Sequence, residues 1–181
     1  MNFSVNIPTI LTFSRILIII PFILVASRNP LLGAALFAVA ALTDLLDGYI
    51  ARRSKQVTKM GILLDPIADK LLVISALIVL VDMGPVTAWL AIVITAREFI
   101  ITALRVVALS KDIVIPAEMG GKIKVVAQIT SILVLFLDKD KTFKSFFDMD
   151  LYGIGISLLW ISMIIGVVSG IQYFVLFGKR L

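Results

Sequence analysis

The sequence contains neither cysteine nor histidine among its 181 residues. Without thiols and imidazoles the chain cannot form disulfides, zinc sites built from those ligands, or a nucleophile and base pair that depends on them. Any catalysis must therefore use Asp, Glu, Lys, Arg, Ser, Thr or Tyr. Any bound metal must accept oxygen ligands, which favours magnesium, manganese or calcium.

Charged residues are also scarce. They make up 16% of the chain, whereas 60% of the residues are hydrophobic. Soluble domains use roughly 45–50% apolar residues, so a fold of this size could not bury so much apolar surface and lipid must solvate much of it. The net charge is +5, but the basic residues form no long run. We therefore expect anionic lipid headgroups and phosphorylated substrates as partners, and no nucleic acid.

Apolar stretches of about membrane-spanning length occur six times. They predict an all-α membrane protein with six transmembrane helices in a single domain, residues 1–181. Gly and Pro residues punctuate the breaks between the stretches. The predicted spans are Thr9 to Ala26, Leu31 to Ile50, Ile62 to Val81, Val86 to Leu109, Ile123 to Leu137 and Tyr152 to Phe177.

The segments between the predicted spans alternate in charge. Short cytoplasmic loops carry an excess of Lys and Arg, which places the 51–61 segment, the 110–122 segment and both termini in the cytoplasm. The opposite side holds Asp82 and the segment from Asp138 to Asp150, whose interleaved Phe residues suit an outer membrane interface. We expect a multi-pass protein of a bacterial plasma membrane, because the chain is short and shows no transit peptide.

Four aspartates, Asp44, Asp47, Asp65 and Asp69, occur in or beside the second and third apolar stretches. A charge inside a span costs roughly 2.5–3.5 kcal/mol on insertion scales. Each pair is spaced three or four residues apart, so it projects from one helical face, and a helical hairpin would bring the two pairs together. With no histidine available, one or two divalent metal ions are the natural partners of four converging carboxylates.

Two other interpretations of the aspartates remain open. They could form salt bridges with basic residues nearby, or they could line the ion path of a divalent-cation transporter or channel. Four acids at helical spacing favour the metal site over a structural network, and the absence of an internal repeat weakens the transporter hypothesis. The basic residues that could pair with them are Arg52, Arg53, Lys59 and Lys70.

Small residues accompany the aspartates on the same helical stripe. Gly48 and Ala51 follow Asp44 and Asp47, and a stripe without bulk would let a phosphorylated ligand reach the backbone. Close packing of two helices is the alternative explanation for such small residues.

Together these residues form the pattern Asp44-x2-Asp47-Gly48-x2-Ala51-Arg52-x8-Gly61-x3-Asp65-x3-Asp69. The pattern resembles the signature of the CDP-alcohol phosphatidyltransferase family, and each position of that signature is matched. The resemblance implies transfer of a phosphatidyl group from CDP-diacylglycerol to an alcohol, with release of CMP. It also implies a six-helix membrane bundle, usually a homodimer, with the active site at the cytoplasmic side.

The resemblance further implies a role for each matching residue. Asp44 and Asp65 would bridge two divalent ions, Mg2+ or Mn2+, while Asp47 would complete one site and Asp69 the other. Asp69 would also take the proton of the acceptor hydroxyl as the catalytic base. The N-terminal segment from Asn6 to Thr12 also resembles the family pattern, although Thr9 stands where Asn is usual. It implies weaker contacts to the nucleotide. The residues implied to bind the CDP-lipid are Gly48, Ala51, Arg52, Thr58, Gly61, Pro8, Thr9 and Thr12.

Four cations indicate the chemistry of the acceptor. Arg97 and Arg105 lie eight residues apart in the fourth span, roughly on one face, and Lys122 and Lys124 open the fifth span. Cations near a metal site predict an acceptor that is itself a phosphate ester. Anchoring to lipid headgroups is the alternative for the lysines, and a pair with the adjacent Glu98 is the alternative for Arg97.

Longer stretches in spans three to five are similar to the phosphatidylglycerophosphate synthase branch of the family. That branch implies sn-glycerol 3-phosphate as the acceptor. A cardiolipin synthase of the CDP-alcohol type, which uses phosphatidylglycerol as acceptor, is the nearest rival because it shares an Asp-Pro-x-Ala-Asp-Lys stretch. The stretches are Leu64 to Leu72, Ala96 to Glu98, Leu104 with Arg105, and Gly121 to Lys124.

Overall fold

The computed structural model describes the backbone of residues 7–54, 59–110, 119–146 and 149–178. Side chains are described for residues 17–43, 70–108, 121, 123–145 and 149–178. Within these ranges the chain is helical and has no strand, which confirms the all-α prediction. The helices are α1 (Ile7–Ala26), α2 (Pro30–Ser54), α3 (Lys59–Asp82), α4 (Ala88–Ser110), α5 (Met119–Lys139), α6 (Lys141–Phe146) and α7 (Leu151–Gly178).

The six long helices correspond to the six predicted apolar stretches, and the short helix α6 is additional. It lies in the polar segment from Asp138 to Asp150, for which no helix was predicted. Asp140 begins it, because the Asp140 Oδ1 accepts a hydrogen bond from the Phe143 N–H at 2.8 Å and so satisfies one free amide of the first turn. At six residues, α6 connects α5 to α7 and is far too short to span a membrane.

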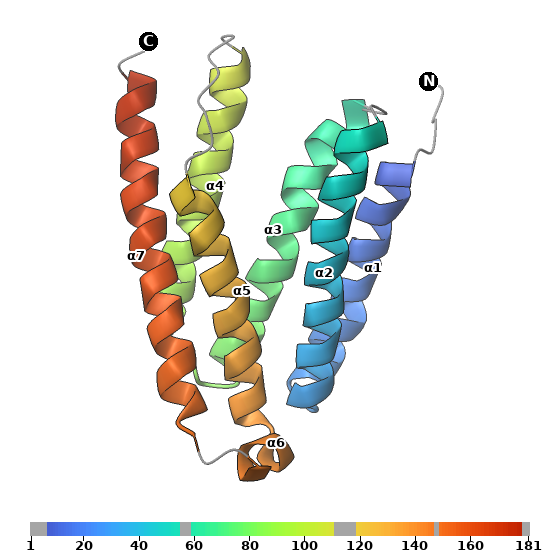
Figure 1. Cartoon of the computed structure of the whole chain (residues 1–181), viewed down its shortest axis with the longest axis vertical. Helices are drawn as coiled ribbons and strands as arrows, with labels where there is room; N and C mark the ends of the chain where they lie inside the picture. Colours follow the sequence, from blue (N-terminus) through green and yellow to red (C-terminus); the bar gives the residue numbers. More distant parts are fainter. Residues whose placement is uncertain (1–6, 55–58, 111–118, 147–148, 179–181) are drawn as a thin grey trace.

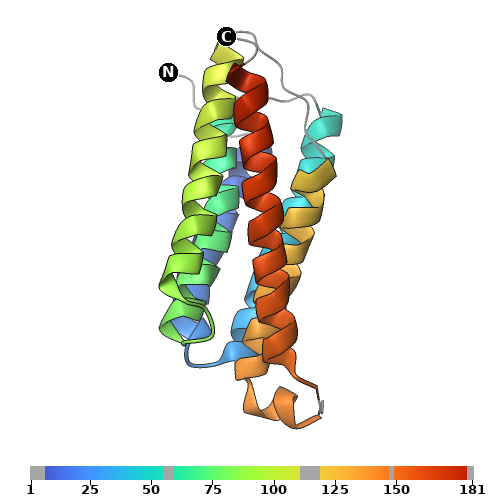
Figure 2. The same ribbon diagram turned by 90° about the vertical axis from the view of Figure 1, so that its left-hand side faces the viewer.

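The long helices run roughly along one axis in two groups. Figure 1 shows α1, α2 and α3 beside one another and α4, α5 and α7 as the second group. The start of α1, the end of α7 and the ends of α2 and α3 that face residues 55–58 all lie at the end of the bundle opposite α6 (Figures 1 and 2). We call this the α2–α3 end and the opposite one the α6 end.

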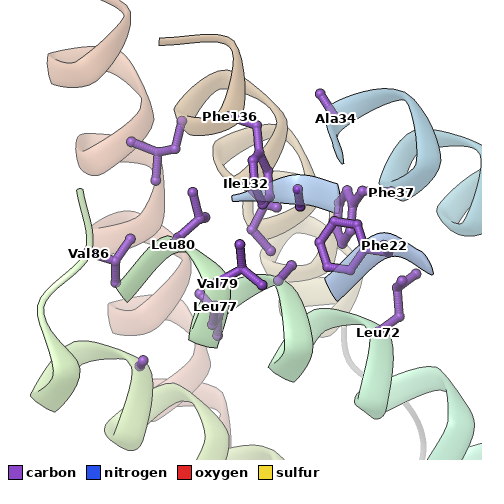
Figure 3. Close-up of a cluster of buried hydrophobic side chains, with 14 of the residues drawn as sticks. Phe22, Ala34, Phe37, Leu72, Leu77, Val79, Leu80, Val86, Ile132 and Phe136 are labelled. Atoms are coloured by element: carbon purple, nitrogen blue, oxygen red, sulfur yellow. The ribbon is translucent and has the colours of Figure 1, made fainter. Parts of the chain in front are cut away.

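Apolar packing is concentrated toward the α6 end. The rings of Phe22 and Phe136 meet edge to face at a centroid distance of 5.7 Å, and Phe37 lies 6.1 Å from Phe22. All three side chains are fully buried, and Figure 3 shows Ile132 close to the ring of Phe136. The cluster draws residues from each of the six long helices and so joins the two groups.

Helices α5 and α7 approach each other closely because small residues lie between them. The Ser131 hydroxyl donates to the Gly155 carbonyl at 2.7 Å, and the Ser162 hydroxyl donates to the Lys124 carbonyl at 3.1 Å. A Cβ on Gly155 would come within 2.7 Å of the Leu135 side chain. Small residues at a helix contact, with hydroxyls that bridge the helices, are typical of membrane bundles.

The connection between α3 and α4 is a tight turn at the α6 end. Gly84 adopts a φ of 91°, which a residue with a side chain rarely adopts, and Pro85 is buried directly after it. The turn brings α4 back antiparallel to α3. Trp89 at the start of α4 then packs edge to face against Trp160 of α7, with ring centroids 5.2 Å apart.

Large apolar side chains also cover the outside of the bundle. Exposed Leu, Ile, Val and Phe residues occur on each of the six long helices, a surface that suits lipid and would be unusual in water. Among the described residues, α7 is the one helix long and apolar enough to cross a membrane on its own composition, and α1 and α2 contain shorter apolar stretches. The fold therefore agrees with a membrane protein.

Candidate active site

The four aspartates of the signature fall at matching depths on two neighbouring helices. Asp44 lies ten residues before the end of α2, and Asp69 lies ten residues after the start of α3. Asp47 and Asp65 lie seven and six residues from the same ends. Since only four residues connect the helices, this backbone arrangement brings both pairs to one level, about 10–15 Å from the connection at 1.5 Å per residue.

For most of the other residues implied to bind the CDP-lipid, the structure gives the helix on which each lies. Gly48, Ala51 and Arg52 lie in α2 and Gly61 in α3, whereas Pro8, Thr9 and Thr12 lie in the first turns of α1. The side chains of these residues, of the four aspartates and of Lys122 lie outside the described residues, as does Thr58 altogether.

The donor set on α2 and α3 fits a hard divalent cation. It offers carboxylates alone, since the sequence has no cysteine or histidine, and oxygen ligands are what magnesium and manganese prefer. Within the side chains that the structure describes, no three acidic residues come together as a metal site. The candidate metal ligands are therefore the signature aspartates and not a group elsewhere in the described part of the bundle.

The described part of the site centres on the carboxylate of Glu98, in the middle of α4. Its Oε2 accepts from the Lys70 ammonium of α3 at 3.1 Å, and its Oε1 accepts from the Arg97 guanidinium at 3.2 Å. The Lys124 ammonium of α5 also donates to Oε1. Glu98 thus joins three cations from three helices, and we call these four side chains the Glu98 group.

Arg97 is also held by α7. Its Nε donates to the Gly166 carbonyl and its Nη2 to the Ser169 hydroxyl, both at 2.7 Å. A Cβ on Gly166 or Gly170 would lie about 3.5 Å from the Arg97 Nε, so the two glycines leave the surface of α7 flat where the guanidinium crosses it. The alternative weighed from the sequence, a pair between Arg97 and Glu98, is present in the structure.

Of the four cations predicted to bind the acceptor, Arg97 and Lys124 come together. Arg105 does not join them: it lies two turns further along α4, is exposed, and its guanidinium carbon stacks 5.6 Å above the ring of Tyr173. Lys70, which the sequence offered as a partner of the aspartates, pairs with Glu98; the aspartate side chains lie outside the described residues.

A small pocket opens beside the Glu98 group, between α4, α5 and α7. Its volume is about 10 Å3, room for roughly one water molecule, and its polar lining comes from Arg97, Glu98, Lys124, Gln128 and Ser162. Gln128 is almost fully buried, and its Nε2 has no hydrogen-bond partner in the described part of the chain. A buried amide donor without a partner makes this small pocket suitable for a bound water molecule.

Nearly the whole sequence matches one known protein family. The sequence model of the CDP-alcohol phosphatidyltransferases matches residues 5–171, which is nearly the whole chain. The chain belongs to the CDP-alcohol phosphatidyltransferase family. The matched range contains the signature helices α2 and α3 and the whole Glu98 group, and it confirms the family that the signature resembled.

Individual relatives extend the comparison. The chain is 44% identical over 144 residues to a CDP-diacylglycerol–glycerol-3-phosphate 3-phosphatidyltransferase of Bacillus subtilis, covering 80% of this chain and 72% of that protein. Proteins of the same name from Rickettsia bellii and Haemophilus influenzae are 34% and 36% identical over 178 residues. These alignments cover 96% of both chains for the first and 93% and 91% for the second.

Proposed function

We propose that this chain transfers the phosphatidyl group of CDP-diacylglycerol to sn-glycerol 3-phosphate, giving phosphatidylglycerophosphate and CMP. The observation that carries the proposal is its family membership together with relatives that bear this name along nearly its whole length. The basic character of the Glu98 group, with three cations around one carboxylate, supports an acceptor that carries a phosphate.

In the proposed reaction, the hydroxyl oxygen of glycerol 3-phosphate attacks the lipid-side phosphorus of CDP-diacylglycerol. A new phosphorus–oxygen bond forms, the bond to the bridging oxygen breaks, and CMP leaves. Asp69 takes the hydroxyl proton as the catalytic base. The reaction needs no covalent intermediate with the protein, so the residues act by binding, orienting and accepting the proton.

Two divalent ions, Mg2+ or Mn2+, would be held by Asp44, Asp47, Asp65 and Asp69. They would supply neutralisation of the pyrophosphate and of the charge that grows on the departing CMP. The matching depth of the two pairs on α2 and α3 supports this assignment. Gly48, Ala51, Arg52, Thr58 and Gly61 would hold the nucleotide end of the CDP-lipid, with weaker contacts from Pro8, Thr9 and Thr12.

The acceptor phosphate would lie on the basic side of the site. Arg97 and Lys124 belong to the Glu98 group, and Lys122 lies on the same helix as Lys124. Arg105 would contribute from further along α4, by leaving Tyr173 when the acceptor binds.

The proposed enzyme is a single membrane domain with six transmembrane helices. The loop charges place the α2–α3 end and both termini in the cytoplasm, where a lipid can enter sideways and glycerol 3-phosphate can arrive from water. A bacterial plasma membrane and a homodimer complete the proposal.

The test is CMP release from CDP-diacylglycerol by the purified protein in detergent or in liposomes. We expect release that requires both a divalent ion and glycerol 3-phosphate, and that stops when EDTA is added. A cation transporter would instead move Mn2+ into liposomes without any CDP-lipid. Mn2+ flux in protein that releases no CMP would refute the proposed function.

A further inference from the structure

The Glu98 group contains more positive than negative charge. Its three cations and one carboxylate leave a net charge of +2 in a mostly buried place, because the Lys124 side chain is 5% exposed and the other three are 15–18% exposed. Three cations cannot be gathered in a bundle of low dielectric constant without a shared anion. The carboxylate is therefore what holds Lys70 and Lys124 near one another, since they come from different helices.

The charge that remains matches a phosphate monoester, which carries about −1.5 to −2 near neutral pH. Each lysine ammonium has three N–H donors and uses one of them on Glu98 within the described part of the chain. Donors from two helices therefore remain for an anion. Arg97 has fewer donors left for an anion, because its Nε and Nη2 already donate to a backbone carbonyl and a hydroxyl of α7.

The group is attached to α3 at the level of the signature. Lys70 directly follows Asp69, and consecutive Cα atoms are about 3.8 Å apart. A phosphate held by Lys70 and Lys124 would therefore lie beside the part of α3 that carries the proposed catalytic base. The hydroxyl and the phosphate of glycerol 3-phosphate are separated by three carbons, a short distance that suits this arrangement.

We propose that Glu98 is a positioning residue for the acceptor phosphate: it holds Lys70 and Lys124 together, and these two ammonium groups bind the phosphate. The proposal rests on the proposed function and deepens it, because Lys70 was not among the cations that the sequence assigned to the acceptor. Glu98 itself touches neither the substrate nor the reacting atoms.

Two other roles for Glu98 predict different kinetics. If the carboxylate only stabilises the bundle, its removal lowers stability and leaves the Michaelis constants unchanged. If the carboxylate competes with the substrate phosphate for the cations, its removal lowers the KM for glycerol 3-phosphate. A positioning role alone predicts a higher KM for glycerol 3-phosphate with the KM for CDP-diacylglycerol preserved.

The experiment compares Glu98→Gln and Glu98→Asp with the wild type in full-length protein, varying each substrate in turn. We expect Glu98→Gln to raise the KM for glycerol 3-phosphate about tenfold, with the KM for CDP-diacylglycerol changed less than about twofold, because misplaced ligands weaken one subsite alone. Glu98→Asp keeps the charge but is shorter, so a rise of about threefold is expected. The inhibition constant of inorganic phosphate against glycerol 3-phosphate should rise in parallel.

Asp138→Asn is the matched control. Asp138 is also a buried acid that pairs with a lysine, Lys144, but it lies at the α6 end, so its loss should lower the melting temperature without changing either KM. If Glu98→Gln does not fold, Glu98→Asp retains the anion and gives the same test. An unchanged or lowered KM for glycerol 3-phosphate in each Glu98 variant that folds would overturn the positioning role.

The wild type separates this proposal from the proposed function. If the wild type releases no CMP with glycerol 3-phosphate, the proposed function fails. If the wild type is active while both Glu98 variants keep its KM for glycerol 3-phosphate, the function stands and the positioning role of Glu98 fails.

Discussion

The α6 end of the bundle is packed from aromatic and aliphatic side chains, whereas the α2–α3 end carries the signature aspartates. The Glu98 group is attached at the same depth of the bundle, because its Lys70 directly follows Asp69 on α3. At the α6 end, Phe22, Phe37 and Phe136 are fully buried and in contact. In the Glu98 group, by contrast, the buried contacts are ion pairs. Buried ion pairs contribute little net stability, because desolvation offsets most of their attraction.

This difference indicates a division of roles between the two ends. Apolar contacts hold the six long helices in place, so the α2–α3 end can gather like charges that would not hold a bundle together by themselves. Substitutions at the α6 end should therefore change stability, and substitutions at the α2–α3 end should change activity.

Asp69→Asn should have the largest effect on activity. The amide cannot accept the hydroxyl proton and is a poorer metal ligand, so we expect kcat to fall by at least about a hundredfold. The measurement is CMP release at saturating substrates, with the melting temperature of the purified protein as the control for folding. A variant that keeps more than half of the wild-type rate would contradict the role of Asp69.

Phe136→Ala should have the largest effect on stability. Truncating a fully buried Phe that contacts the ring of Phe22 leaves a cavity, which typically costs about 3–5 kcal/mol. Thermal unfolding in detergent measures the loss. Below the lowered melting temperature, the KM for glycerol 3-phosphate should equal that of the wild type, and a change in it would show that the two ends are coupled.

Two glycines of α7 allow a matched comparison of the two ends. In Gly155→Ala the new Cβ would meet Leu135 at 2.7 Å, and this overpacking should cost about 1–3 kcal/mol without affecting substrate binding. In Gly166→Ala the Cβ would meet the Lys124 Cδ at 3.2 Å, so the lysine should shift and the KM for glycerol 3-phosphate should rise about threefold.

Gly178→Ala serves as the control for this comparison, because the added Cβ meets no atom of another described helix within 4 Å. It should match the wild type in melting temperature and in both Michaelis constants. If Gly155→Ala raised the KM for glycerol 3-phosphate as much as Gly166→Ala does, the separation between the ends would be wrong.

The pair between Lys144 of α6 and Asp138 should have the smallest effect. The hydrogen bond that the Lys144 ammonium donates to the Asp138 carboxylate raises the pKa of Lys144 above its ordinary value of 10.5. A raised lysine pKa stabilises the fold below that ordinary value, and the stabilisation is lost as the pH rises through the higher folded value. Because Lys144 is 56% exposed, the gain is small.

The measurement is the melting temperature of the wild type and of Lys144→Met at pH values from about 8 to about 11, a range that spans the ordinary pKa of lysine. The small advantage of the wild type should be present at the lower end and shrink toward the upper end. An advantage that grows with pH would mean that another group is responsible.

Much of the fold could be predicted from the sequence, since each long helix coincides with an apolar stretch that is long enough to be recognised. The helix α6 was missed because six polar and aromatic residues give no periodic pattern. Asp140 directly before it is a residue type that often caps a helix start, and this was a weak sequence signal for the helix. The placement of the aspartates on two consecutive helices followed from their spacing, and their metal-binding role stays a prediction.

The cation group was predicted less completely. The pair between Arg97 and Glu98 could be weighed because the residues are adjacent, but Lys70 and Lys124 lie 28 and 26 positions from Glu98, and no sequence pattern indicates which helices pack together. Arg105 shares a face with Arg97 by spacing alone, yet the aromatic ring of Tyr173 draws it to α7. Gly166 and Gly170 were missed, although two glycines four residues apart in an apolar helix are a signal of a close helix approach.

The most direct test of the central claim is the destination of labelled sn-glycerol 3-phosphate. Purified protein is incubated with CDP-diacylglycerol, a divalent ion and the labelled acceptor, with phosphatidylglycerol as the competing acceptor. We predict that the label enters phosphatidylglycerophosphate in a one-to-one ratio with released CMP, and that phosphatidylglycerol is not consumed. Formation of cardiolipin, with no label in lipid, would contradict the account and identify the acceptor as phosphatidylglycerol.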